Sequence, residues 1–161
     1  MGKKPHRTQN VVSLGERCRI ELLTLANHAE AVNGLLYLAG AGWTEHHRML
    51  PPNGPMPASI VGLAAMVYIP WMETNREHKI AFGIEDHDGK SISSIEMKFT
   101  VGRPPTLSAG AGQHVPLALN MGVGFPGAGG YRLVARLNDT GDVRTWSFRV
   151  HDQQAQQASG N

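Results

Sequence analysis

The chain has 161 residues, a formal net charge of +2 and a single cysteine, Cys18. This length suits one domain that removes roughly two thirds of its unfolded surface from water. One cysteine excludes an intramolecular disulfide and a thiolate metal cluster. The sequence shows no apolar leader and no run of eighteen apolar residues, so we expect a soluble protein without a membrane span, cytoplasmic when made.

The positive charge is concentrated at the amino end. Lys3, Lys4 and Arg7 lie within the first ten residues, and the rest of the chain carries twelve basic and thirteen acidic side chains. Binding to nucleic acid depends on a concentrated positive patch, so we expect no specific nucleic-acid partner. We expect residues 1–16 to form a flexible, solvated arm.

In chain order, the first strands are expected at about 19–25, 35–40 and 59–69. These are short apolar segments bounded by turn residues. The intervening residues 26–32, Ala-Asn-His-Ala-Glu-Ala-Val, are compatible with a turn or two of helix, which Asn33 and Gly34 would end.

The next segment, residues 68–101, combines histidines and carboxylates with two alternating apolar runs. Alternate positions are apolar on both sides of the sequence Asp-His-Asp-Gly-Lys at 86–90, the period of two that a half-buried strand requires. Asp and Gly supply the acceptors and the positive φ that a tight turn uses. The polar residues are therefore interpreted as the rim and turn of a β-hairpin, with an apolar face formed by Ile80, Phe82, Ile84, Ile95, Met97, Phe99 and Val101.

A strand at about 114–120 and a second hairpin complete the pattern. Tyr131 and Leu133 alternate with arginines before the turn residues 138–142, and Trp146 and Phe148 alternate with polar residues after them. About eight short strands predict an all-β fold, an antiparallel β-sandwich of immunoglobulin-like or jelly-roll-like form. We place this domain at residues 17–151, followed by a polar tail at 152–161.

Histidines raise the possibility of a metal site, led by Glu45-His46-His47 with His28, His78 or His87 as further ligands. Adjacent side chains on a strand point to opposite faces, and no His-x-His or His-Glu-x-x-His spacing is present. His46 and His47 are therefore weak candidates. We expect neither a metal nor another cofactor, and a His-dependent metal hydrolase is the least favoured function.

Nucleophilic catalysis has no better support. No serine lies in the Gly-x-Ser-x-Gly turn that would expose an activated hydroxyl, and Cys18 lies near the amino end. We therefore expect a protein that is not an enzyme.

Two tryptophans are the best candidates for binding. Trp43 and Trp71 follow the ends of expected strands, where loops gather, although core packing is the commoner role for either residue. A large amphipathic ring can anchor an interface or form a ligand platform. The candidate interaction residues are Trp43, Tyr68, Trp71 and Arg76.

Residues 23–43 and 66–90 resemble an uncharacterised family of small, β-rich bacterial and actinobacteriophage-associated proteins. The similarity extends more loosely to the closing stretch at 131–150, and so covers most of residues 20–150. The family has no assigned activity and therefore implies no catalytic residues. It implies a scaffold built on a consistent plan of hairpins.

The leading hypothesis is a non-enzymatic module that acts through protein surfaces. We expect a subunit of a larger assembly such as a phage virion, as a head decoration, minor capsid or tail component, with other proteins or copies of itself as partners. The alternative is a β-sandwich that binds a carbohydrate or small molecule through the loops around Trp43 and Trp71.

Overall fold

The computed structural model describes residues 16–138 and 140–154, and these residues form an all-β protein without an α-helix. A short 3-10 helix, η1, spans Trp71–Glu73. The strands are β1 (Arg19–Ala26), β2 (His28–Val32), β3 (Leu35–Ala39), β4 (Glu45–Leu50), β5 (Ser59–Ile69), β6 (Glu77–Asp86), β7 (Ser91–Thr100), β8 (Gln113–Val123), β9 (Gly129–Leu137) and β10 (Asp142–Gln154).

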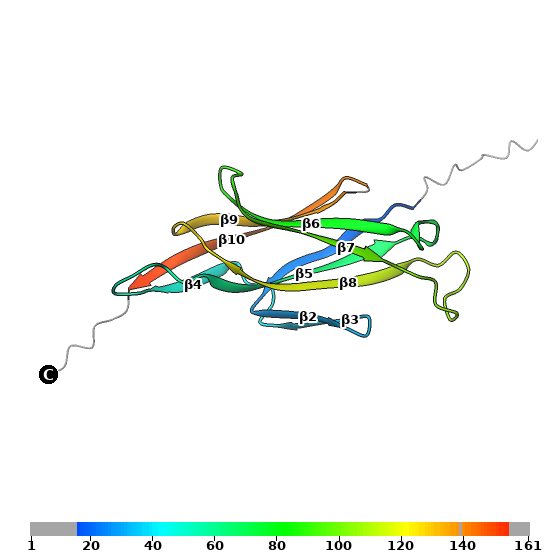
Figure 1. Cartoon of the computed structure of the whole chain (residues 1–161), viewed down its shortest axis with the longest axis horizontal. Coiled ribbons are helices and arrows are strands. Elements are labelled where there is room, and N and C mark those ends of the chain that lie inside the picture. Colours follow the sequence, from blue (N-terminus) through cyan, green and yellow to red (C-terminus); the bar gives the residue numbers. More distant parts are fainter. Residues whose placement is uncertain (1–15, 139, 155–161) are drawn as a thin grey trace, which may run out of the picture.

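These strands form three sheets. One has the order β1-β5-β8, a second has the order β4-β10-β9-β6-β7, and the third is the two-stranded sheet β2-β3. Figure 1 shows the β2–β3 hairpin as a separate layer on the far side of β5 and β8 from β6 and β9. The hairpin therefore covers the outer face of the three-stranded sheet.

The core lies between the two larger sheets. Alternate residues of each strand point inward, as the period of two requires, and fully buried side chains include Leu63 and Val67 of β5, Phe82 of β6 and Leu133 of β9. Side chains of β10 also close one margin of this core. Asp142 and Arg144 bond the backbone of Ile20 in β1, at 2.7 and 3.0 Å.

The hairpin predicted from residues 68–101 is confirmed. β6 pairs with β7 in antiparallel register, with Phe82 opposite Ile95. The Asp86 side chain accepts hydrogen bonds from the backbone N–H groups of Asp88 and Lys90, at 3.0 and 2.9 Å, which closes the turn. The polar residues of this segment are placed by strand pairing and chain reversal.

The hairpin near the carboxyl end is confirmed as well. β9 pairs with β10 antiparallel, and Phe148 lies opposite Tyr131, both on the core side. Trp146 is partly buried against the same core. The strand β10 continues to Gln154, which is three residues beyond the expected end of the domain.

Three expectations need correction. Residues 28–32 form strand β2, so the helical turn expected there is wrong. Ten strands are present among the described residues where about eight were expected, because β2 and β4 were not predicted. Finally, β4 runs parallel to β10, whereas only antiparallel pairs were expected.

The arm and the tail fall largely outside the described residues. Of the predicted arm only Glu16 is described, and of the predicted tail only residues 152–154. Within the described part of the chain, no helix is long and apolar enough to cross a membrane.

Candidate interaction surface

The β2–β3 hairpin turns through two residues, Asn33 and Gly34. Both have positive φ, 51° and 76°, which is the signature of a type I′ turn. Asn tolerates this conformation and Gly adopts it without steric cost, so Asn-Gly is the strongest short-range signal for a hairpin. The sequence interpretation recognised these residues as a break but missed the hairpin they form.

Two residues of the three-stranded sheet hold the hairpin in place. Gly62 of β5 allows a close approach, since a Cβ there would lie only 2.9 Å from the Ala29 nitrogen and 3.0 Å from the His28 carbonyl carbon. Asn120 of β8 accepts a hydrogen bond from the Ala29 N–H at 2.9 Å and donates one to the Ala29 oxygen at 2.8 Å. The edge of β2 is thereby joined to the body of the protein.

The outer face of the hairpin carries three exposed apolar side chains. Leu35 is 58% exposed, Tyr37 53% and Val32 38%. Val32 and Leu35 are cross-strand partners next to the turn, and Tyr37 is paired with Glu30. We call Val32, Leu35 and Tyr37 the hairpin surface.

Trp43, a predicted binding residue, packs against the core. Its ring meets Phe148 edge-on at 5.5 Å between centroids and lies 5.4 Å from His46. Its carbonyl oxygen accepts a 3.0 Å hydrogen bond from Nε1 of Trp146. These contacts fit the commoner role of core packing, although the ring is still partly exposed.

Tyr68 lies in a small polar cluster on the outer face of β5. Its hydroxyl donates to Glu16 at 2.7 Å, and this bond raises the pKa of the Tyr68 hydroxyl. The Arg19 guanidinium carbon lies 4.1 Å from the ring centre, and the His114 ring lies 5.4 Å away. Burial opposes ionisation of the neighbouring Glu21, but hydrogen bonds from Arg19 and His114 outweigh it and lower the pKa of Glu21.

Trp71 is the first residue of η1, and Arg76 follows this short helix. The Arg103 guanidinium carbon lies 4.3 Å from the Trp71 ring centre, and its Nη2 donates to the Trp71 oxygen at 2.9 Å. Arg103 also donates to the Thr74 hydroxyl at 2.6 Å. Arg76 forms a 2.9 Å ion pair with Glu73. The contacts of Arg103 attach the loop after β7 to η1 and the residue that follows it.

The structure does not bring all four predicted residues together. Gly42, which precedes Trp43, bonds to Leu25 near the end of β1. Tyr68 of β5 pairs instead with Arg19, the first residue of β1. Trp71 lies three residues after Tyr68 in the chain. Trp43 and Trp71 therefore lie at opposite ends of the three-stranded sheet, and one ligand platform cannot include both.

His46 and His47 diverge, as adjacent residues of a strand must. His46 bonds the Ser59 hydroxyl at 2.9 Å, and burial, followed by the nearby charge of Arg48, lowers the pKa of His46. His47 stacks on His151, with ring centres 4.8 Å apart. Among residues 16–138 and 140–154, no group of three or more His, Cys, Asp or Glu side chains is placed to hold a metal ion.

The further candidate ligands are also dispersed. His78 is buried in β6, where its Nε2 lies 2.7 Å from the Glu73 oxygen. His87 is exposed in the β6–β7 turn, and His28 is exposed at the start of β2.

A charged network covers the outer face of the five-stranded sheet. Glu85 of β6 accepts from Arg136 at 2.7 Å and from Arg132 at 2.9 Å. The bond from Arg136 is the main cause that lowers the pKa of Glu85; burial opposes it, and the bond from Arg132 reinforces it. The network thus pairs one carboxylate with two guanidinium groups on this face.

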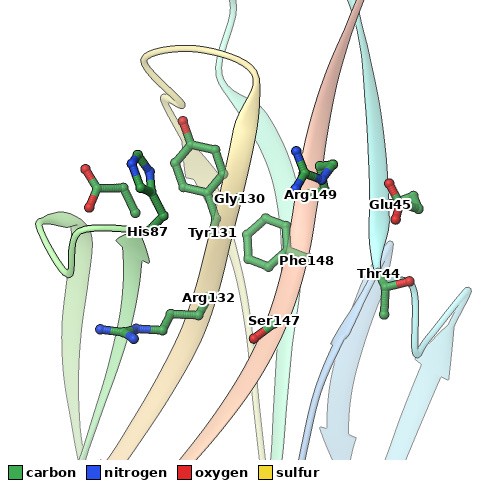
Figure 2. A pocket seen from close by; sticks show the side chains of 10 residues that line it. Thr44, Glu45, His87, Gly130, Tyr131, Arg132, Ser147, Phe148 and Arg149 are labelled. Atoms are coloured by element: carbon green, nitrogen blue, oxygen red, sulfur yellow. The ribbon is translucent and has the colours of Figure 1, made fainter.

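An open pocket of about 400 Å³ adjoins the network. Figure 2 shows its lining residues, which extend from His87 at the β6–β7 turn, across Arg132 and Ser147, to Arg149 and to Glu45 at the start of β4. Gly130 contributes no side chain and leaves space between them. The walls carry charges of both signs, which is unlike a dedicated anion site.

Together, the fold and the hairpin surface define a small all-β domain with an exposed apolar attachment. The chain belongs to the family described as "Family of unknown function (DUF6941)", whose model matches residues 21–151. A comparison with curated proteins finds no match. The expectation of an uncharacterised, β-rich family is thus confirmed.

Proposed function

We propose that this protein is a non-enzymatic protein-interaction module, a subunit of a larger assembly such as a phage head or tail. The hairpin surface carries this proposal. Val32, Leu35 and Tyr37 present apolar area on an element that, in the described part of the chain, pairs with no other sheet. Clustered exposed apolar side chains typically mark sites of protein association.

The scaffold we propose is an immunoglobulin-like or jelly-roll-like sandwich. One detail supports the immunoglobulin-like form. The Tyr131 hydroxyl, near the start of β9, donates a 2.7 Å hydrogen bond to the oxygen of Gly127, four residues upstream. Many immunoglobulin-like domains fix a late strand with a tyrosine bonded in this way.

The proposal is tested in the cells that encode the protein. Tagged chain is expressed there, and its particle size is measured by gradient sedimentation. We expect the wild type to sediment with a large assembly and Leu35→Lys to sediment free. Val143→Lys is the matched control, because Val143 is also exposed, at 48%, but lies on β10 of the five-stranded sheet and not on the hairpin. Free sedimentation of the wild type would contradict the proposal.

A second candidate is a ligand-binding module, favoured by an open groove of about 570 Å³ beside Trp43. Asn27, Glu45 and His47 contribute polar groups to its walls. An aromatic ring with nearby polar side chains suits a carbohydrate or other small polar molecule. Quenching of tryptophan fluorescence by a sugar, lost in Trp43→Phe and retained in Trp71→Phe, would favour this alternative.

A further inference from the structure

Among the residues that the structure describes, the strand β3 has an unpaired edge. It pairs there with β2 alone, and the two-residue turn makes Val32 and Leu35 a hydrogen-bonded pair. Backbone groups alternate in direction along a strand, so the N–H and C=O groups of Leu36 and Leu38 point away from β2. The same alternation directs the N–H and C=O groups of Ala29 away from β3. The hydrogen bonds between these two groups and Asn120 agree with this alternation.

The other sheet edges in the described chain carry features that oppose strand addition. The edge of β1 is bonded by side chains of β10 at Ile20, and β8 contains Pro116. Glu96 and Lys98 place charges on β7, and β4 contains a glutamate, two histidines and an arginine. In contrast, β3 reads Leu-Leu-Tyr-Leu-Ala, with no charge and no proline. An edge of this kind is a template for pairing.

We propose that β3 pairs antiparallel with β3 of a second copy of this chain, across a twofold axis at Tyr37. This inference rests on the proposed function and names one partner for its surface. In this register Leu36 lies opposite Leu38 of the partner subunit. Both residues direct N–H and C=O groups toward each other, so hydrogen-bonded pairs form on each side of Tyr37.

Charge and side-chain chemistry suit this pairing. Leu35 lies opposite Ala39 of the partner subunit, and Tyr37 lies opposite its own copy, so each of the two large exposed apolar residues of β3 gains an apolar neighbour. Of the β2 residues that pair with this strand, only Glu30, the partner of Tyr37, is acidic or basic apart from His28. Three strand spacings place the two copies of Glu30 about 14 Å apart, beyond the screening length of about 8 Å at physiological salt.

Disulfide trapping tests the register directly. At the non-hydrogen-bonded Tyr37 pair the two Cα atoms would lie about 4.5 Å apart, within the range of a disulfide. We expect purified Tyr37→Cys to form a covalent dimer on mild oxidation. Leu35→Cys, whose opposite residue is Ala39 of the partner subunit, should form much less of it. The natural Cys18 is buried, so it provides little background. Equal trapping in both variants, or trapping only in Leu35→Cys, would overturn the register.

Charge reversal tests the pairing without a covalent bond. We expect the purified wild type to sediment as a dimer, and both Tyr37→Lys and Tyr37→Glu to sediment as monomers, because like charges would be directly opposite. An equimolar mixture of these two variants should restore the dimer. Tyr37 is largely exposed, so both variants should fold.

The two proposals fail in different ways. A wild-type monomer in purified form that still joins a large assembly in cells would overturn the β3 pairing and leave the interaction function standing. A purified dimer that joins no larger assembly in cells would support the pairing and contradict the assembly role.

Discussion

Asn120 on β8 holds Ala29 on β2 through both polar groups of its backbone, at 2.9 and 2.8 Å. The carboxamide acts as a neighbouring strand would, donating one hydrogen bond and accepting another. This side chain is a two-bond polar link between the hairpin and the sheet beneath it.

Removal of that link should loosen the hairpin. We expect Asn120→Ala to lower the free energy of unfolding by about 1–3 kcal/mol, because two backbone groups of Ala29 lose their partner. Hydrogen exchange should rise at residues 28–39 in particular. Asn53→Ala, at an exposed loop position, is the control and should change neither quantity. Unaltered exchange in Asn120→Ala would contradict this role.

The close approach at Gly62 predicts a steric effect. Gly62→Ala should lower the free energy of unfolding by about 1–3 kcal/mol, because the new methyl group would press on the backbone of β2. Gly122 of β8 faces the same side, and a Cβ there would meet only ordinary contacts, at 3.5 Å or more. Thermal denaturation of Gly62→Ala and Gly122→Ala should therefore show a clear loss in the first variant only.

The turn of the hairpin depends on backbone conformation. Gly34 has a φ of 76°, and a Cβ at this position would meet no atom within 4 Å, so Gly34→Ala isolates the conformational cost. We expect a loss of about 1 kcal/mol in the free energy of unfolding. Gly102→Ala also meets open space but has no positive φ, and it should be neutral or slightly stabilising. Equal stability of the two variants in urea would argue against the type I′ turn.

The carboxylate of Glu85 predicts a pH dependence with a defined sign. Its folded pKa lies below the ordinary value of 4.5, so the unfolded chain takes up the proton more readily. The stabilisation is therefore complete above about pH 4.5 and is lost as the pH falls through the folded pKa. We expect Glu85→Gln to be less stable than the wild type at pH 7, with a difference that shrinks in acid.

The control for this titration is Glu30→Gln, at an exposed position of the hairpin. Denaturation curves of the three proteins between pH 7 and pH 2 make the comparison. If the difference in unfolding free energy between wild type and Glu85→Gln stays constant over this range, the ion pairs with Arg132 and Arg136 do not contribute as expected.

Local patterns explain which elements could be predicted. The β6–β7 hairpin follows from apolar residues at every second position around a turn that contains Asp86 and Gly89. By contrast, β2 contains two Ala and one Glu, which are poor strand formers, and its strand state depends on pairing with β3. β4 pairs with β10 about a hundred residues away, so no local signal reveals it.

The candidate site was predicted only in part. Trp43 and Trp71 were correctly placed after strands, yet their positions at opposite ends of one sheet depend on how β1 and β5 pair. The hairpin surface was not predicted, although the Asn33-Gly34 pair signalled it. The sequence does not distinguish an exposed Leu35 or Tyr37 from a buried one, because exposure depends on which other segments pack against the side chain.

The amino-acid order by itself determined the all-β class, the two long hairpins and the alternation that fills the core, because these depend on side-chain period and turn chemistry between near neighbours. Only the tertiary structure decided which strand edges are covered, which aromatic rings share a surface and where the β2–β3 hairpin lies. These features arise from contacts between distant segments, whose pairing is selected by the packing of the whole chain.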